Sequence, residues 1–370
     1  MNIPLVLDTE TVSYVIGDGA IERSFVKIGQ FKRIFVIMDD NVEKHCYPVL
    51  KQKLPKLKVS GTVTILSGEE NKSIHQLIYI WNELTRLNVG RDDLILNLGG
   101  GVLTDIAGFA AATFKRGVQF MNFPTTLLGM VDAAIGGKTG IDFDRFKNQV
   151  GLFVNPVCVV ADPVFLPTLE KPHWQSGFAE VIKYGLIMDR ELWRNLEGKL
   201  YLDIKDWSPV IVKAARDKID IVRFDVLEKG IRKNLNFGHT VGHALESFYL
   251  KSENPITHGK AVAAGMICES WISSQVFSME CTNVESIVSM IDHNFERLDF
   301  GHDDIPRIME LMKQDKKIRD KKQNFSLLRK IGKAVHEIEI EEEMIVNCLD
   351  FYINRKKCKK LEDSDKEKGE

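Results

Sequence analysis

Three histidines and one glutamate have the types and spacing that suit a metal ion. His239 and His243 are four residues apart in NFGHTVGHALE, so a helix would place both on one face. His258 follows in THG, and Glu180 lies upstream in GFAEVIK, a segment that also has helical periodicity. A lone histidine is usually a hydrogen-bonded structural residue, but three clustered with a carboxylate are harder to explain in that way. Three or four nitrogen and oxygen ligands with one position left open would make a catalytic zinc site.

The stretch LILNLGGGVLTD, residues 94–105, is the candidate for binding a phosphate. An apolar run is followed by three glycines and a segment with helical composition. Such a turn brings backbone N–H groups up to a phosphate, and side chains at the glycines would block that approach. The stretch is neither GxGxxG nor a Walker A loop, and the glycines alone fit a tight turn without a ligand equally well. Asp105 is expected in the first helical turn, where the helix dipole stabilises a carboxylate or a ribose hydroxyl can be held.

A set of cationic side chains beside glycines, prolines or expected helix ends points to a small anionic substrate. Most lysines are solvated surface residues. Lys138 is different, because AAIGGKTG surrounds it with glycines and apolar residues that favour a less exposed position. A substrate with a phosphate and a carboxylate would fit the set. Its members are Arg116, Lys138, Lys147, Lys183, Lys218, Arg232 and Lys316.

The first part of the chain must position the glycine turn, and its pattern is that of an α/β domain. Strand-like apolar runs alternate with helical segments, which predicts a mostly parallel, Rossmann-like sheet. One amphipathic helix is expected from about Ser73 to Leu87, and another begins at Pro124-Thr125-Thr126. A pair of short strands is expected within 1–16. The other predicted strands are 33–38, 62–66, 94–98, 119–123 and 157–161.

The character changes after Asp162, where strand signals nearly vanish. Only 324–340 suggests a hairpin. We therefore expect an α/β domain over 1–162, an all-α domain over 163–353, and a charged, disordered tail over 354–370. The predicted helices of the second domain are 174–193, 208–223, 239–249, 260–277 and 305–316.

Composition excludes several classes of protein. A chain of 370 residues with 44% hydrophobic and 28% charged residues predicts a globular protein with a full core. A formal net charge of −2 argues against a nucleic-acid partner, and no apolar stretch is long enough for a membrane span. No signal peptide is recognisable, and the six scattered cysteines include no CxxC pair. We expect a cytoplasmic protein with reduced thiols.

A series of motifs resembles the 3-dehydroquinate synthase family of sugar-phosphate cyclases. The motifs occur in the family's order, from about Asp39 to Lys317, and together are far more specific than three glycines. They are GGGVLTDIAGF, RG, PTTLL, VDAAIGGKTG, KNQVG, AEVIK, LNFGHTVGHA and THGKAVAAGM.

The resemblance implies bound NAD and one divalent metal, zinc or cobalt. The family's metal ligands match Glu180, His239 and His258. His243 is implied to contact the substrate phosphate, which overrides the spacing argument that made it a ligand. The positions matching NAD contacts are Asp39, Asn41, Glu69, Lys72, Gly100, Gly101, Val102, Asp105, Thr125, Thr126, Lys138, Lys147 and Thr168.

The implied substrate is 3-deoxy-D-arabino-heptulosonate 7-phosphate, and the products are 3-dehydroquinate and phosphate, within the shikimate pathway of aromatic amino acid biosynthesis. Lys218 and Arg232 would hold the substrate carboxylate. Arg116 matches a residue that reaches the phosphate from the neighbouring subunit, which implies a homodimer. The other implied substrate contacts are Asp132, Lys138, Asn148, Lys183, Asn236, His243 and Lys316. Among these, Lys138, Asn148, Asn236, His243 and Lys316 would hold the phosphate.

The implied reaction uses the cofactor without consuming it. NAD takes a hydride from a carbon whose hydroxyl the metal has acidified, phosphate leaves by β-elimination, NADH returns the hydride, and an intramolecular aldol step closes the ring. In the family the leaving phosphate is thought to act as the base. The protein mainly fixes geometry and charge.

Three alternatives stay open at this point. Sister cyclases act on sedoheptulose 7-phosphate or glucose 6-phosphate, which carry no carboxylate, so Lys218 and Arg232 argue against them. A metal-dependent alcohol dehydrogenase would consume NAD and would not need the lysine cluster. A catalytically dead scaffold is disfavoured because every matched position is filled. One departure is Ile141-Asp142, where the family often has Val-Asn, and Asp142 adds negative charge near the implied phosphate site.

Overall fold

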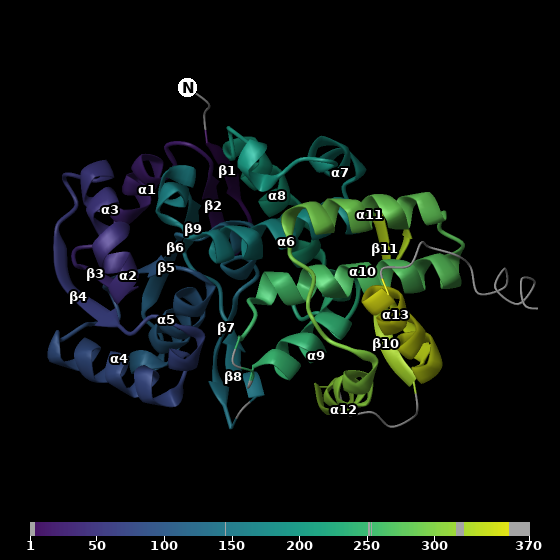
Figure 1. Cartoon of the computed structure of the whole chain (residues 1–370). Helices are drawn as coiled ribbons and strands as arrows, with labels where there is room; N and C mark the ends of the chain where they lie inside the picture. Colours follow the sequence, from purple (N-terminus) through teal and green to yellow (C-terminus); the bar gives the residue numbers. More distant parts are fainter. Residues whose placement is uncertain (1–3, 145, 251, 253, 316–321, 355–370) are drawn as a thin grey trace, which may run out of the picture. The chain divides into compact units, whose positions relative to one another are not determined.

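The computed structural model describes residues 4–144, 146–250, 252, 254–315 and 322–354 (Figure 1). The chain forms two compact units, one of Met1–Gly177 with Asp206–Ile219 and the other of Phe178–Lys205 with Asp220–Glu370. The boundary expected at residue 162 stays a prediction. The expected tail lies outside the described residues except for Asn354, and so does Lys316.

A seven-stranded sheet organises the first unit, in the order β1-β2-β9-β6-β5-β3-β4. All neighbouring strands are parallel except β1 and β2, which confirms the mostly parallel sheet and the expected strand pair near the N-terminus. Every residue of β5 is buried, as is typical of a parallel strand covered on both faces. The strands are β1 (Leu5–Asp8), β2 (Ser13–Ile16), β3 (Ile34–Asp39), β4 (Val59–Ile65), β5 (Leu94–Gly99), β6 (Gln119–Pro124) and β9 (Cys158–Ala161).

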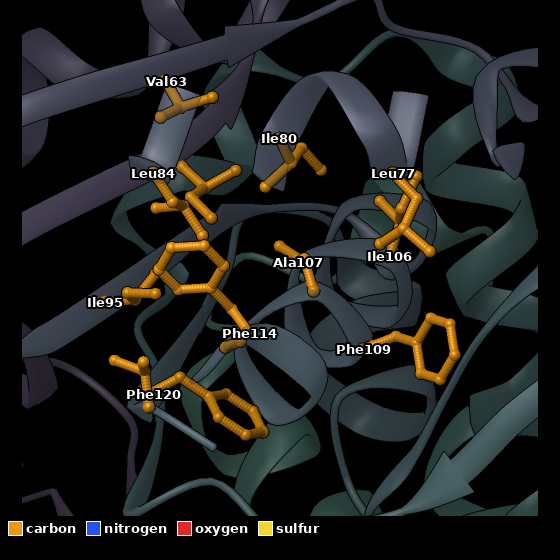
Figure 2. Packing of buried hydrophobic residues seen from close by; sticks show 14 of the residues in the cluster. Val63, Leu77, Ile80, Leu84, Ile95, Ile106, Ala107, Phe109, Phe114 and Phe120 are labelled. Carbon is orange, nitrogen blue, oxygen red and sulfur yellow. The ribbon is translucent and has the colours of Figure 1, made fainter. Parts of the chain in front are cut away.

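Helices α4 (Ile74–Arg86) and α5 (Gly101–Thr113) bury their apolar side chains against β3, β4, β5 and β6. Figure 2 shows this core, in which Leu77, Ile80 and Leu84 of α4 come from one helical face. Ser73 caps α4 as its expected N-terminus requires. The packing fixes α5 directly behind β5 and so fixes the glycine turn between them. The remaining helices wholly within this unit are α1 (Ala20–Ile28), α2 (Asp40–His45), α3 (Tyr47–Lys53), the short 3-10 helices Glu69–Asn71, Phe114–Arg116 and Pro163–Thr168, and a π-helix, Gly129–Ala133.

An antiparallel hairpin of β7 (Lys138–Phe143) and β8 (Phe146–Phe153) also belongs to the first unit. No strand is predicted there from the sequence. Gly140 and Gly151 face each other across the hairpin, and a Cβ on Gly151 would lie 2.2 Å from the carbonyl oxygen of Thr139. The glycines that permit this close approach also interrupt the alternation by which a strand is recognised.

The second unit is helical, as expected, and α10 (His258–Phe277) lies at its centre. This helix is buried almost all round and packs against α9 (His239–Tyr249), α11 (Cys281–Asn294) and α13 (Glu342–Asn354). The expected hairpin near 324–340 is present as β10 (Lys322–Lys330) and β11 (Lys333–Glu341).

Two helix predictions need correction, and two helices of the second unit are missed. The helix expected over 174–193 is two helices, α6 (Lys171–Ile187) and α7 (Arg190–Leu196). Asp189 divides them, because its carboxylate accepts hydrogen bonds from the N–H groups that begin α7. Helix α10 starts at His258, two residues earlier than expected, after the cap Thr257. Helices α11 and α13 are not predicted from the sequence.

Other helices predicted after residue 162 agree with expectation. α8 (Ser208–Phe224) and α12 (Ile305–Asp315) lie at the predicted places. Within the described residues, none of the helices has both the length and the apolar composition that crossing a membrane requires.

Candidate active site

Glu180, His239 and His258 come together in the second unit. They lie on three helices, with Glu180 inside α6 and the two histidines at the first positions of α9 and α10. One ligand atom from each lies within 4.8 Å of the others. The sequence therefore places the three expected metal ligands at one point, although 78 residues separate Glu180 from His258 along the chain.

Both histidines turn the same ring nitrogen towards Glu180. Nε2 of His239 is 3.5 Å from Oε1 of Glu180, and Nε2 of His258 is 3.7 Å from the same oxygen. Nδ1 of His239 is 3.1 Å from the carbonyl oxygen of Phe237. A carbonyl can only accept, so His239 carries its hydrogen on Nδ1 and leaves the lone pair of Nε2 available.

The surroundings of this group shift the pKa values of His239 and His258 in opposite directions. Burial lowers the pKa of His239, and the ammonium of Lys183 lowers it further. Burial also opposes the charged form of His258, but hydrogen bonding to Glu180 and to Glu246 outweighs it and raises the pKa of His258 to about 10. Lys183 is itself buried and forms an ion pair with Glu180.

The donor set fits a divalent metal such as zinc. A carboxylate oxygen and two imidazole nitrogens are the ligands of many catalytic zinc sites, which leave a fourth position for substrate or water. A metal would displace the proton from His258, because imidazole coordinates only in its neutral form. The same carboxylates that favour a proton on His258 would favour a dication there.

His243 lies near this group but outside it. Its ring centroid is 5.3 Å from that of His239 and 6.0 Å from that of His258. It belongs to a second group that could hold a metal, with Glu246 and His258. The HxxxH spacing correctly indicates that His239 and His243 are neighbours, and sequence reasoning does not single out Glu246.

Packing within the protein disfavours side chains at the glycine turn of the first unit. A Cβ on Gly100 would lie 3.0 Å from Cγ2 of Thr126, and one on Gly101 would lie 2.9 Å from the Cβ of Ala133. These contacts account for the glycines without a ligand, while the turn still presents the backbone N–H groups at the start of α5. Asp105 lies in the second turn of α5, one turn later than expected.

Lys72 connects the expected cofactor residues with the β7–β8 hairpin. Its ammonium is 2.6 Å from Oδ2 of Asp105 and also donates to the side chain of Asn148. Burial disfavours its charge, but Asp105 outweighs burial and raises the pKa of Lys72. Lys147 on the hairpin pairs with Glu69 at 3.3 Å. Residues implied to bind cofactor and residues implied to bind phosphate thus form one network.

The other expected cofactor residues lie at the carboxyl ends of the parallel strands or beside them. Asp39 ends β3 and caps α2 by accepting the N–H of Val42, and Asn41 donates to Ser67. Such strand ends are where open α/β sheets place ligands. The remaining members are Val102 at the start of α5, Thr125 and Thr126 after β6, and Thr168, which ends a 3-10 helix.

Two predicted contacts for the substrate carboxylate are buried cations. Lys218 in α8 donates to the carboxylate and to the backbone oxygen of Asp132, at 2.7 and 2.6 Å. Arg232, in the 3-10 helix Ile231–Asn236, is 1% exposed and donates to the carbonyl of Val226 at 2.7 Å. Each lies in its own unit, Lys218 in the first and Arg232 in the second.

The remaining predicted residues differ in their surroundings. Lys138 is exposed, against the expectation from its neighbours. Asn236 donates to Glu228, a carboxylate that sequence reasoning does not single out and whose backbone is left-handed at φ 57°. Arg116 is exposed.

Comparison with known proteins decides the family. The model described as 3-dehydroquinate synthase N-terminal matches residues 62–176, and the C-terminal model matches 177–318. The chain belongs to the 3-dehydroquinate synthase family. A curated 3-dehydroquinate synthase from Parabacteroides distasonis is 38% identical over 335 residues, which are 89% of this chain and 94% of the relative.

Solved structures agree with the fold of a 3-dehydroquinate synthase family member. The 2-epi-5-epi-valiolone synthase from Streptomyces hygroscopicus, with NAD+ and Zn2+ bound, has a TM-score of 0.82 at 25% identity, over 95% of this chain and 99% of that one. A 2-deoxy-scyllo-inosose synthase complexed with carbaglucose-6-phosphate, NAD+ and Co2+ has a TM-score of 0.78 at 22% identity, over 91% and 96% of the two chains, and shows the fold alone.

Proposed function

We propose that the chain is a 3-dehydroquinate synthase, which converts 3-deoxy-D-arabino-heptulosonate 7-phosphate to 3-dehydroquinate and phosphate with NAD+ and one divalent metal, zinc or cobalt. The observation that carries the proposal is the convergence of Glu180, His239 and His258 in a chain whose curated relatives of that name match it almost from end to end. NAD+ and a metal are also bound by the valiolone synthase of the same fold.

The substrate carboxylate distinguishes this reaction from those of the sister cyclases. Lys218 and Arg232 are the residues we assign to it, and burial of both cations supports that assignment, because a desolvated charge attracts an anion more strongly than a solvated one. Lys218 is already paired with Asp132, so we propose that the substrate shares its ammonium with that carboxylate.

When bound, the metal lowers the pKa of a neighbouring hydroxyl, and NAD+ accepts a hydride and later returns it. Glu180, His239 and His258 would hold the metal. The backbone at Gly100 and Gly101 would receive the cofactor phosphates, with Asp39, Asn41, Glu69, Lys72, Val102, Asp105, Thr125, Thr126, Lys147 and Thr168 around the cofactor.

The substrate phosphate would be held by cations and amides before and after it leaves. We assign this to Lys138, Asn148, Asn236, His243 and Lys316, of which Lys316 lies outside the described residues. Asn148 is held by the ammonium of Lys72, so its amide is positioned before substrate arrives. Lys183 and Asp132 complete the substrate contacts.

We further propose that the enzyme is a cytoplasmic homodimer in which Arg116 reaches the neighbouring active site. Lys115 and Arg116 have positive φ values of 50° and 67°, which is uncommon for residues other than glycine, and functional sites are one place where such residues cluster. The five cysteines in the described part of the chain are free, as suits a reducing compartment.

The test is phosphate release from 3-deoxy-D-arabino-heptulosonate 7-phosphate. NAD+ is supplied in a substoichiometric amount relative to the substrate, and Zn2+ or Co2+ is added to metal-free protein. Many phosphates released per NAD+ are expected. Release only from sedoheptulose 7-phosphate would assign the chain to a sister cyclase. Net NADH accumulation on a simple alcohol, without phosphate release, would instead indicate a dehydrogenase.

A further inference from the structure

Each of the two histidines in the metal-ligand group has a buried carboxylate behind it, and neither carboxylate belongs to the set assigned above. Glu246 is the eighth residue of α9 and is 8% exposed. Glu269 lies in the middle of α10 and is fully buried. A buried charge is costly unless it is paired, so both positions need an explanation.

Glu246 acts directly on His258. Its Oε2 is 3.5 Å from Nδ1 of His258, while Nε2 of the same ring faces Glu180. A carboxylate on one ring nitrogen fixes the tautomer and orientation of an imidazole and raises the basicity of the other nitrogen.

Glu269 acts on His239 through one peptide group. Its Oε2 accepts the N–H of Gly238 at 2.6 Å, and its Oε1 accepts the N–H of Val241 at 3.1 Å. The N–H of Gly238 and the carbonyl of Phe237 belong to the same peptide unit, and that carbonyl accepts Nδ1–H of His239 at 3.1 Å. The carboxylate, the peptide and the imidazole therefore form a continuous chain of hydrogen bonds, in which each bond polarises the next.

Close packing of the two helices makes this chain possible. A Cβ on Gly265 would lie 2.0 Å from the carbonyl oxygen of Gly238 and 2.8 Å from the nitrogen of Gly242. Gly265 is one turn before Glu269 on α10, so the absence of a side chain there lets the start of α9 come within reach of the carboxylate.

We propose that Glu246 and Glu269 are reciprocal positioning residues for the metal site. Helix α9 supplies Glu246 to orient the histidine that begins α10, and α10 supplies Glu269 to orient the histidine that begins α9. The two carboxylates raise the affinity of the site for a divalent cation without touching it. This inference rests on the metal site of the proposed function.

The test measures metal affinity in full-length protein freed of metal with a chelator. Zn2+ affinity is determined by competition with a chromophoric chelator, and the visible spectrum of added Co2+ reports the coordination geometry. Glu246→Gln and Glu269→Gln are expected to bind Zn2+ about 10–100-fold more weakly than wild type, as is usual for loss of such outer partners. Glu285→Gln, the same change at an exposed position of α11, should bind as wild type does.

Several outcomes would overturn the inference. Glu246→Gln and Glu269→Gln with Zn2+ affinities within about twofold of wild type would do so, as would a lower melting temperature with unchanged Zn2+ affinity and Co2+ spectrum, which indicates a structural role alone. If Glu269→Gln does not fold, Glu269→Asp retracts the carboxylate by one methylene. Weaker Zn2+ binding by that variant supports the relay, and unchanged binding overturns it.

Failure of the metal site itself has a different signature. Zn2+ binding by wild type that is lost in Glu180→Gln, but unaffected by the two positioning variants, leaves the proposed function standing and removes this inference. Wild-type protein that binds neither Zn2+ nor Co2+ would overturn both.

Discussion

Lys218 is the single residue on which the choice of substrate can be tested most directly. Lys218→Ala is expected to weaken binding of the carboxylate substrate by several kcal/mol at most, because a partner to a charged group is lost, and to leave Zn2+ affinity unchanged. Steady-state kinetics of phosphate release and a Zn2+ titration measure the two effects. Lys213→Ala, on the same helix and paired with Asp217, is the matched control.

Arg232→Ala should also weaken binding of the carboxylate substrate. Because the guanidinium is buried, the free energy of unfolding of this variant is measured as well. Wild-type KM values for the carboxylate substrate in both Lys218→Ala and Arg232→Ala would contradict the assignment of substrate class.

Asp142 brings a negative charge to a hairpin that we propose binds phosphate, and the structure gives that residue a local role. Its Oδ1 accepts the backbone N–H of Asn148 at 2.7 Å, and its own N–H donates to the carbonyl of Lys72 at 2.8 Å. Asn148 has a left-handed backbone, with φ 52°, which asparagine tolerates better than most residues. Asp142 therefore helps to hold the backbone conformation of Asn148.

Two substitutions separate the charge of Asp142 from its hydrogen bond, and they are expected to change KM in opposite directions. Asp142→Asn keeps an acceptor and removes the charge, so KM should fall about 2–5-fold, in line with the small energies of partly exposed charges. Asp142→Ala also removes the acceptor and should raise KM. Asp144→Asn, on the exposed turn of the same hairpin, is the control for loss of charge alone. A higher KM in Asp142→Asn would contradict the expected repulsion.

The sequence identifies the candidate metal ligands but not the carboxylates that position them. His239, His243 and His258 stand out because histidine is rare and their spacing is regular. Glu269 does not, because its two hydrogen-bond donors are 31 and 28 residues away and both are backbone groups, which carry no sequence signal. The role of Asp142 likewise depends on a hairpin that the sequence pattern does not predict.

At the scale of elements, the contact between α9 and α10 holds the two histidine-bearing helix starts together. Gly265→Ala would place a methyl group against the backbone of α9, and backbone atoms cannot move aside as a flexible side chain can. We expect a loss of about 1–3 kcal/mol in the free energy of unfolding, with weaker Zn2+ binding. Thermal unfolding and chelator competition measure both.

Gly301→Ala is the matched control, because a Cβ there meets nothing within 4 Å. Equal free energies of unfolding for Gly265→Ala and Gly301→Ala would show that α9 and α10 can move apart without loss of stability, which would contradict the role given to their close contact.

The elements that were predicted and those that were missed differ in how they are stabilised. α4 carries an amphipathic stripe and a serine cap, and β5 is a continuous apolar run, so both have local signals. The division of α6 from α7 depends on Asp189 acting as a cap in the middle of an apparently continuous helical pattern. In the β7–β8 hairpin, β8 is exposed throughout and each strand is interrupted by a glycine, so the sequence shows no clear alternation there.

At the scale of the whole molecule, we expect the proposed second copy of the chain to cover β8. Every residue of this strand is exposed, including Phe146, Val150 and Leu152. Exposed strands and apolar patches can mark a surface that pairs with another chain. Val150→Asp combined with Leu152→Asp should shift a dimer to a monomer in light scattering after size exclusion. Val26→Asp, an exposed position on α1, should not, and a persistent dimer in the double variant would contradict this surface.

If Arg116 reaches the neighbouring active site, as we propose, catalysis depends on the dimer, and mixing two inactive variants tests this. Arg116→Ala lacks the arginine, and Glu180→Gln lacks a metal ligand, so each homodimer should be nearly inactive. In a mixed dimer, the site with intact Glu180 receives Arg116 from the other chain. If the subunits assort at random after joint refolding, about a quarter of wild-type activity should return. An arginine acting within its own subunit would leave every site defective, and the mixture would stay inactive.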